Sequence, residues 1–182
     1  MTDAETVAAV LAGDRGRFAE LVERHGRPLF GWLARRTLDA EEARDVFQDT
    51  WVRAFEALAD LRDPGRVRAW LFTIASNGMR SRGRRAASAP GVDPEQRPSD
   101  LAARGEVDPL EAGDLRDAQR RALARLTDRQ REVFELRVGA GLAHAEIADL
   151  LGIREDNARA HYHHAVIRLR ELLSNYHDSP ES

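Results

Sequence analysis

The residues with the clearest potential for chemistry are arginines gathered near the middle of the chain. Arg80, Arg82, Arg84 and Arg85 lie at the end of a stretch with helical spacing. A guanidinium group carries a permanent charge and a planar set of donors that suits phosphate oxygens. A solvated helix end, where the helix dipole favours cations, is the plainer alternative. The clustering favours a nucleic-acid backbone as the ligand slightly over that alternative.

A second set of polar side chains lies on one face of an amphipathic helix that we expect between residues 39 and 58. Apolar residues and one threonine recur at three- and four-residue steps and predict a buried stripe of Ala43, Val46, Phe47, Thr50, Trp51, Ala54, Phe55 and Leu58. Asp45, Gln48 and Asp49 fall on the opposite face. They can form charge-assisted hydrogen bonds with a basic partner. A face exposed only to water is the common alternative, and these residues alone leave it open.

The sequence gives little support for an enzyme or for a metal site. The chain has no P-loop, nucleophile elbow or HExxH sequence, so we predict no catalytic residue and no cofactor. His161 and His164 have a spacing that suits metal ligands on a helix, but the chain has no Cys and no obvious carboxylate to complete a set. We therefore predict no metal site.

Composition narrows the class of protein further. The net charge of −3 argues against bulk coating of nucleic acid, although charge can still gather locally. The N-terminus is too weakly apolar for a signal peptide, and no stretch approaches the roughly 20 apolar residues of a membrane span. These features predict a soluble, cytoplasmic protein without membrane insertion.

The 182 residues suffice for two small domains, and their patterning is helical. Helix-start signals, an N-cap residue followed by Glu or Gln three places later or by Pro at the next position, stand at Thr2, Asp39, Asp63 and Thr127. In block 1–85 we expect two short helices around residues 18–22 and 29–33. The helix after Asp63 is expected to bury Val67, Trp70, Leu71, Ile74 and Ala75.

Residues 86–113 differ from both flanks, because prolines alternate there with Gly, Ser, Ala and acids. Such a segment buries too little surface to fold, so we predict a flexible acidic linker. Helical patterning resumes over residues 114–176, and 177–182 form a short tail. No strand-like alternation occurs, and the predicted fold class is all-α with two small helical domains.

The second block contains the spacing of a helix-turn-helix, a short helix followed by a glycine turn and a longer helix. Ala148 lets the two helices approach, Gly152 permits the tight turn, and Ile153 fills the corner between them. The longer helix would then lie in the major groove of DNA. An ordinary helical hairpin also uses a glycine turn and is the alternative.

Together, these motifs resemble the extracytoplasmic-function sigma factors, the smallest branch of the sigma-70 family. Residues 43–51 resemble the family's polymerase-binding helix, and residues 68–77 resemble its minus-ten-reading helix. Residues 126–134 and 146–153 resemble its minus-thirty-five reader. The resemblance spans nearly the whole chain. It implies sigma region 2 over residues 1–85, sigma region 4 over residues 114–176, and promoter-specific initiation of transcription.

For region 2, the resemblance implies a polymerase surface and a promoter surface. Asp45, Gln48 and Asp49 would contact the clamp helices of the β′ subunit of core RNA polymerase. The turn from Asp60 to Arg66 would capture a base of the opened minus-ten element, and the next helix would hold the strand. The implied DNA-binding residues are Arg62, Asp63, Arg66, Asn77, Arg80, Arg82, Arg84 and Arg85. Trp70 could stack on a base, but its apolar stripe favours core packing.

For region 4, the resemblance implies contacts with the β flap and the minus-thirty-five element. The implied DNA-binding residues are Arg154, Asn157, Arg159, His161 and His164. Asp156 stands where the family usually has Gly, and His161 and His164 stand where it usually has Arg. We hypothesise that these imidazoles tighten DNA binding as the pH falls, which His→Gln variants would test. The family also implies an anti-sigma partner. A stand-alone helix-turn-helix regulator that does not bind polymerase is the alternative function.

Overall fold

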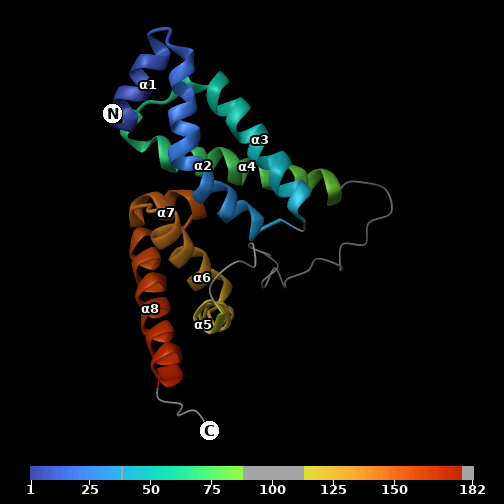
Figure 1. Cartoon of the computed structure of the whole chain (residues 1–182), viewed down its shortest axis with the longest axis vertical. Coiled ribbons are helices and arrows are strands. Elements are labelled where there is room, and N and C mark those ends of the chain that lie inside the picture. The colour runs from blue at the N-terminus through green and yellow to red at the C-terminus, as the bar shows by residue number, and fades with distance from the viewer. Residues whose placement is uncertain (38, 88–112, 178–182) are drawn as a thin grey trace. The chain divides into compact units, whose positions relative to one another are not determined.

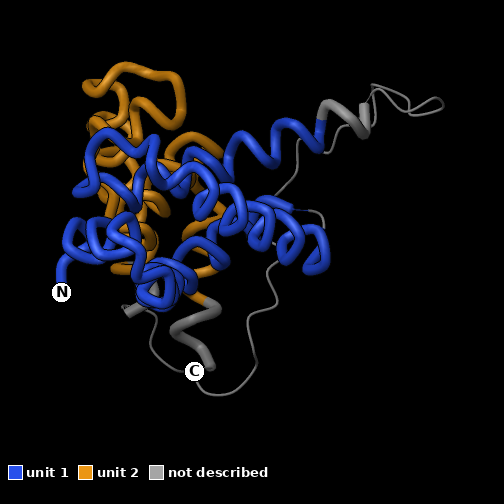
Figure 2. The backbone as a smooth tube through the Cα atoms, turned by 90° about the horizontal axis from the view of Figure 1, so that it is seen from above, with its two compact units in different colours: residues 1–101 blue, residues 102–182 orange. Residues whose placement is uncertain are grey.

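The computed structural model describes residues 1–37, 39–87 and 113–177 (Figure 1). All regular structure within these ranges is helical, which confirms the predicted all-α class. The chain divides into two compact units, residues 1–101 and 102–182 (Figure 2). The predicted linker, residues 86–113, lies outside the described residues except at its two ends, and residues 178–182 of the predicted tail lie outside them as well.

The first unit is built from four α-helices and three short 3-10 turns in the part that the structure describes. They are α1 (Asp3–Leu11), η1 (Arg15–Arg17), α2 (Phe18–Ala34), α3 (Ala40–Glu56), η2 (Leu58–Asp60), η3 (Pro64–Arg66) and α4 (Val67–Ala87). The predicted start signals are confirmed: Thr2 and Glu5 form a capping box, and the carboxylate of Asp39 accepts a hydrogen bond from the backbone of Glu42 at 2.7 Å. These local bonds define where the helices begin.

The prediction of two short helices near residues 18–22 and 29–33 is wrong, because α2 is one continuous helix with Pro28 inside it. A proline removes one helical hydrogen bond and usually breaks or kinks a helix. Here Leu21, Leu29 and Leu33 are all buried, so both halves of α2 bury the same apolar face. Tertiary packing of this face outweighs the local effect of Pro28, since most of a helix's stability in a protein comes from such packing.

The predicted stripe on α3 supplies much of the core of the first unit. Its buried members are Ala43, Val46, Thr50, Trp51, Ala54 and, in η2, Leu58. Phe55 differs from the prediction, because it is 40% exposed and packs edge-on against Phe18, with ring centroids 5.1 Å apart. Phe55 therefore lies at the rim of the core, although Leu58 beyond it is buried.

The buried face of α4 is partly different from the predicted one. Val67, Leu71 and Ala75 are buried as predicted, but Trp70 and Ile74 are only half-buried. Phe72 is fully buried instead and packs against Trp32 of α2, with ring centroids 5.3 Å apart. Because α4 contacts both α2 and α3, its buried face widens toward Phe72.

The described part of the second unit is a helical bundle around one long helix. Its elements are α5 (Gly113–Ala124), α6 (Asp128–Phe134), the π-helical turn η4 (Glu135–Gly139), α7 (His144–Leu151) and α8 (Glu155–His177). Helix α8 packs against α5, α6 and α7. Between α7 and α8, Gly152 has a φ of +65°, the left-handed conformation that ends a helix and favours glycine. The predicted helix-turn-helix geometry is therefore present.

Candidate functional site

The first candidate surface is built where α3 and α4 approach each other closely. Gly78 of α4 is buried, and a Cβ atom on it would lie 3.6 Å from the Cγ1 atom of Val46. That is an ordinary van der Waals distance, so α4 packs directly against α3 at these two residues. On α3, Asp45 directly precedes Val46 and Asp49 follows three residues later, while Arg82 lies one turn beyond Gly78 on α4. The close approach brings these charged groups within reach of one another.

The predicted polymerase-binding residues lie on the solvent side of α3. The side chains of Asp45 and Asp49 are 57% and 49% exposed, and Gln48 is exposed as well. Their neighbours Val46 and Thr50 are buried, so α3 separates its polar and apolar sides as predicted. Two carboxylates one helical turn apart repel each other and favour a cation between them.

That cation is supplied by the protein itself. The guanidinium group of Arg82 donates through Nη1 to Asp45 Oδ2 at 3.2 Å and through Nη2 to Asp49 Oδ2 at 2.9 Å. The hydrogen bond to Asp49 is the largest of the causes that raise the pKa of Arg82 above its usual value. We call this three-residue arrangement the α3–α4 clasp. It joins residues that the sequence assigned to two different surfaces.

The predicted arginine cluster is therefore divided. Thr73, Asn77 and Arg80 follow each other at steps of four and three residues on α4, and all three are exposed on one face. Arg82 lies two residues beyond Arg80, on a different face, and belongs to the clasp. The side chains of Arg84 and Arg85, which were also predicted to bind DNA, lie outside the described residues.

The turn before α4 holds the other predicted minus-ten residues. Arg62, Asp63 and Arg66 are all exposed. Asp63 also has a structural task, because its Oδ1 atom accepts a hydrogen bond from the backbone of Gly65 at 2.9 Å and caps η3. The turn is thus preorganised by its own sequence, which lowers the cost of presenting its arginines to a ligand.

Sequence reasoning missed the residues that anchor α1 beside this turn. Helix α1 contacts η2 and η3, and Asp3 at its start pairs with Arg24 and with His25 of α2. The Nε2 atom of His25 lies 2.9 Å from Asp3 Oδ2, and its side chain is 1% exposed. Burial lowers the pKa of His25, although the Asp3 carboxylate opposes that shift. The partners stand more than 20 positions apart, so no local pattern could have revealed the pair.

The predicted minus-thirty-five residues do not form one surface. Asn157, His161 and His164 follow the spacing of a single face of α8, where Asn157 and His164 are exposed and His161 is half-buried. Arg159 lies two residues from Asn157 and therefore points to another side. Arg154 stands just before the helix, with 82% of its side chain exposed.

The two arginines of this helix start are accompanied by acids. Arg159 donates to Glu155 Oε1 at 2.5 Å, and Arg154 lies 3.6 Å from Asp156 Oδ2. The hydrogen bond from Arg159 to Glu155, with the attraction of that carboxylate, raises the pKa of Arg159. Each pair is close to neutral, so the start of α8 offers less positive charge to a phosphate backbone than its arginines suggest.

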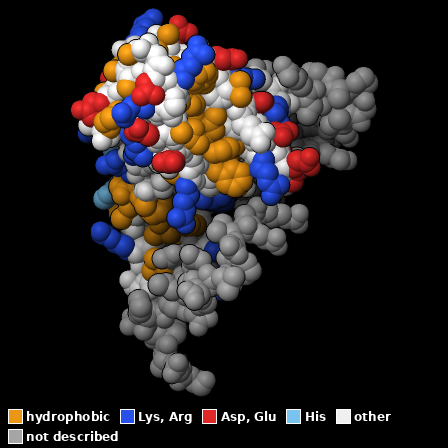
Figure 3. Space-filling model, turned by 45° about the horizontal axis from the view of Figure 1, so that its top comes forward, with side chains coloured by type: hydrophobic (Ala, Val, Ile, Leu, Met, Phe, Trp, Pro, Cys, Tyr) orange, Lys and Arg blue, Asp and Glu red, His pale blue; other side chains and the backbone are white. Residues whose placement is uncertain are grey.

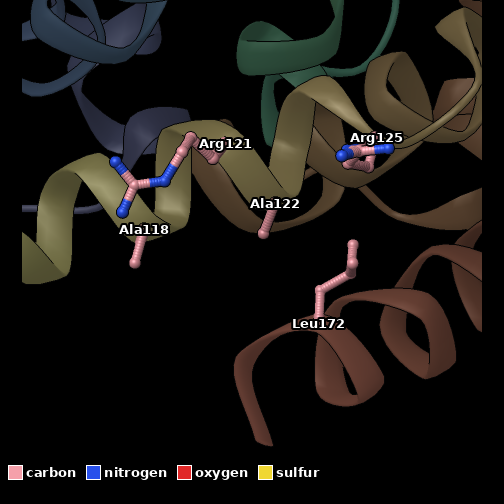
Figure 4. A pocket seen from close by; sticks show the side chains of 5 residues that line it. All are labelled: Ala118, Arg121, Ala122, Arg125 and Leu172. Atoms are coloured by element: carbon pink, nitrogen blue, oxygen red, sulfur yellow. The ribbon is translucent and has the colours of Figure 1, made fainter. Parts of the chain in front are cut away.

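Two cavities lie among the described residues of the second unit. One of about 190 Å³ lies between α5 and α8, where Ala118 and Ala122 point toward Leu172 (Figure 4). A shallower one of about 360 Å³ is lined by Arg125, Thr127, Gln130, His164, Ile167, Arg168 and Glu171. Within the described ranges, no group of three or more His, Cys, Asp or Glu side chains is arranged to hold a metal ion.

One face of the molecule, drawn in Figure 3, carries charges of both signs. On this face, arginines, acids and hydrophobic side chains are interspersed. No helix among the described residues combines the length and apolar character needed to cross a bilayer.

Comparisons with known proteins agree with these two units. Residues 21–89 match the family model of sigma-70 region 2, and residues 116–169 match that of sigma-70 region 4. The ECF RNA polymerase sigma factor SigL of Mycobacterium tuberculosis is 33% identical over 168 residues, which cover 92% of this chain and 94% of SigL. The chain belongs to the extracytoplasmic-function RNA polymerase sigma factors of the sigma-70 family. The resemblance carried by the motifs is confirmed, and a stand-alone regulator receives no support.

Solved structures of sigma factors are similar to this chain. CnrH in complex with the cytosolic domain of CnrY is 31% identical, with a TM-score of 0.62 over 97% of this chain and 99% of CnrH. RpoE of Bartonella quintana in complex with the anti-sigma factor NepR is 27% identical, with a TM-score of 0.61 over 86% of this chain and 96% of RpoE.

Proposed function

We propose that this sigma factor docks on the clamp of the polymerase β′ subunit through Asp45, Gln48 and Asp49. The observation that carries the proposal is the exposed acidic face of α3, opposite a buried apolar stripe. A basic partner can form charge-assisted hydrogen bonds with both carboxylates. Removing one partner of such a pair at an interface typically costs about 2–5 kcal/mol.

The same unit reads and opens the minus-ten element of the promoter. Arg62 and Arg66 of the preorganised turn, together with Asn77 and Arg80 of α4, are accessible to a single strand. Holding an unpaired base compensates for an unstacking cost of a few kcal/mol. The second unit binds the β flap and places the start of α8 on the minus-thirty-five element.

This activity is binding without catalysis, carried out in the cytoplasm where the polymerase is. Since two structurally similar sigma factors were solved with bound partners, CnrY for CnrH and the anti-sigma factor NepR for RpoE, we extend an anti-sigma partner to this chain. Such a partner would regulate the sigma factor by covering the surfaces that otherwise bind polymerase.

Association with core RNA polymerase tests the proposal. Asp45→Asn combined with Asp49→Asn is expected to weaken binding at least about tenfold and to reduce transcription in vitro in proportion. Asp14→Asn combined with Glu23→Gln removes the same charge from exposed positions outside α3 and is the matched control, because Asp14 also pairs with an arginine, Arg17. Equal affinities for the two double variants would contradict the assignment of the α3 face.

A further inference from the structure

The α3–α4 clasp connects two surfaces to which the proposed function gives different partners. Asp45 and Asp49 belong to the polymerase surface, whereas Arg82 lies on α4, the helix of the promoter surface. One guanidinium group satisfies both carboxylates, with one nitrogen directed at each. A partner for either surface therefore meets groups that are already engaged within the protein.

We propose that Arg82 couples the two surfaces, holding Asp45 and Asp49 in the free chain and turning to a DNA phosphate when these carboxylates take up a basic partner. The inference rests on the proposed function, because it needs a basic partner on α3 and a nucleic-acid strand along α4. Arg82 is thereby a positioning residue for the acidic face as well as a phosphate ligand.

The exposure of the clasp makes this exchange feasible. The side chains of Arg82, Asp45 and Asp49 are 31%, 57% and 49% exposed, so water and incoming partners reach all three. Ion pairs at such positions are weak, because water and salt compete with them. A phosphate can take the place of the two carboxylates, because two of its oxygens can accept hydrogen bonds from one guanidinium group. The clasp is therefore strong enough to orient the groups and weak enough to be displaced.

Coupling of this kind is reciprocal. A basic partner on Asp45 and Asp49 releases Arg82, and a phosphate on Arg82 releases the two carboxylates. Whichever partner arrives second no longer has to break the clasp, and each partner raises the affinity for the other by the same factor. Because the clasp consists of two exposed links, we expect that factor to be about two- to fivefold.

Binding of single-stranded DNA to the full chain without polymerase tests the first half of the coupling. The probe is a short, fluorescently labelled single strand of mixed sequence at low salt, read by anisotropy. Asp45→Asn with Asp49→Asn is expected to tighten binding about two- to fivefold more than the control pair Asp14→Asn with Glu23→Gln. In an Arg82→Gln background, this difference between the two pairs should vanish. Equal effects of the two pairs, or a difference that persists without Arg82, would overturn the coupling.

Affinity for core RNA polymerase tests the second half and separates the coupling from the proposed function. Arg82→Gln is expected to tighten binding about two- to fivefold, because it frees the carboxylates. Arg82→Lys keeps the charge but lacks the planar fork, so it should also tighten binding while retaining more affinity for single-stranded DNA. If the Asp45/Asp49 variant binds polymerase normally, the proposed function fails. If that variant binds weakly and Arg82→Gln does not bind more tightly, the coupling alone is refuted.

Discussion

Both units pair arginines with carboxylates, but over different distances along the chain. In the first unit, Arg82 of α4 reaches residues 33 and 37 positions earlier on α3. In the second unit, Arg159 pairs with Glu155, four positions earlier on the same helix. The local pair only lowers the charge of one helix end, whereas the long-range pair links two helices with separate predicted partners. The effect of an arginine–carboxylate pair therefore depends on whether it lies within one helix or links two helices.

Comparing the two units assumes that each of them folds separately. Shortening a buried leucine in each core tests this assumption, and it has the largest effect expected here. Leu71 in the first unit and Leu136 in the second are both fully buried. Replacing either with Ala is expected to lower the free energy of unfolding of its own unit by about 2–5 kcal/mol, because a cavity remains. All three tryptophans lie in the first unit, so their fluorescence reports on that unit alone. If Leu136→Ala shifted the unfolding transition seen by tryptophan fluorescence, the two units would not fold separately.

The contrast between local and long-range pairs is sharpened by neutralising acids on α8. Glu155→Gln is expected to free Arg159 and to tighten binding of duplex promoter DNA several-fold at low salt, with a salt slope steeper by about one phosphate contact. Glu171→Gln is the matched control, because it frees Arg168 from a similar local pair beyond the predicted reading residues. Equal effects from both variants would mean that net charge, and not the position of Arg159, governs the affinity.

The smallest expected effect concerns the buried His25, which pairs with Asp3 where α1 is anchored to α2. Burial lowers the pKa of His25 in the folded state, so below about pH 6.5 the unfolded chain binds a proton more readily than the folded chain. The free energy of unfolding of the first unit should therefore fall as the pH drops through this value, by at most about 1.4 kcal/mol per pH unit.

Tryptophan fluorescence during denaturant unfolding at several pH values measures this slope. His25→Gln is expected to flatten it. His144→Gln removes a histidine of the second unit whose pKa is also lowered, chiefly by burial, and it should leave the tryptophan transition unchanged. An unaltered slope in the His25 variant would show that other groups cause the pH dependence.

Local features of the fold could be predicted because their causes lie within a few residues. The capping boxes at Thr2 and Thr127, the N-cap at Asp39 and the left-handed turn at Gly152 all form where the sequence predicted them. Each depends on hydrogen bonds or backbone preferences that span at most one turn. The exposure of Asp45, Gln48 and Asp49 could be predicted in the same way, because the spacing of apolar residues within one helix shows which face is buried.

Other features could not be predicted, because they depend on residues distant in the chain. The continuity of α2 through Pro28, the burial of Phe72 in preference to Trp70, and the pairing of His25 with Asp3 all require knowing which helices are neighbours. The spacing of apolar residues shows which face of a helix is buried. It does not show how much of the helix surface the neighbouring helices cover. The same limit concealed the division of the arginine cluster on α4.

The sequence by itself determined the all-α class, the helix starts, the helix-turn-helix and the family. Each of these can be recognised from residue types that stand only a few positions apart. Only the tertiary structure decided that Arg82 faces Asp45 and Asp49 while Asn77 and Arg80 remain on another side of α4. The physical reason is the close approach of α3 and α4 at Val46 and Gly78, which brings together charges that are far apart in the chain.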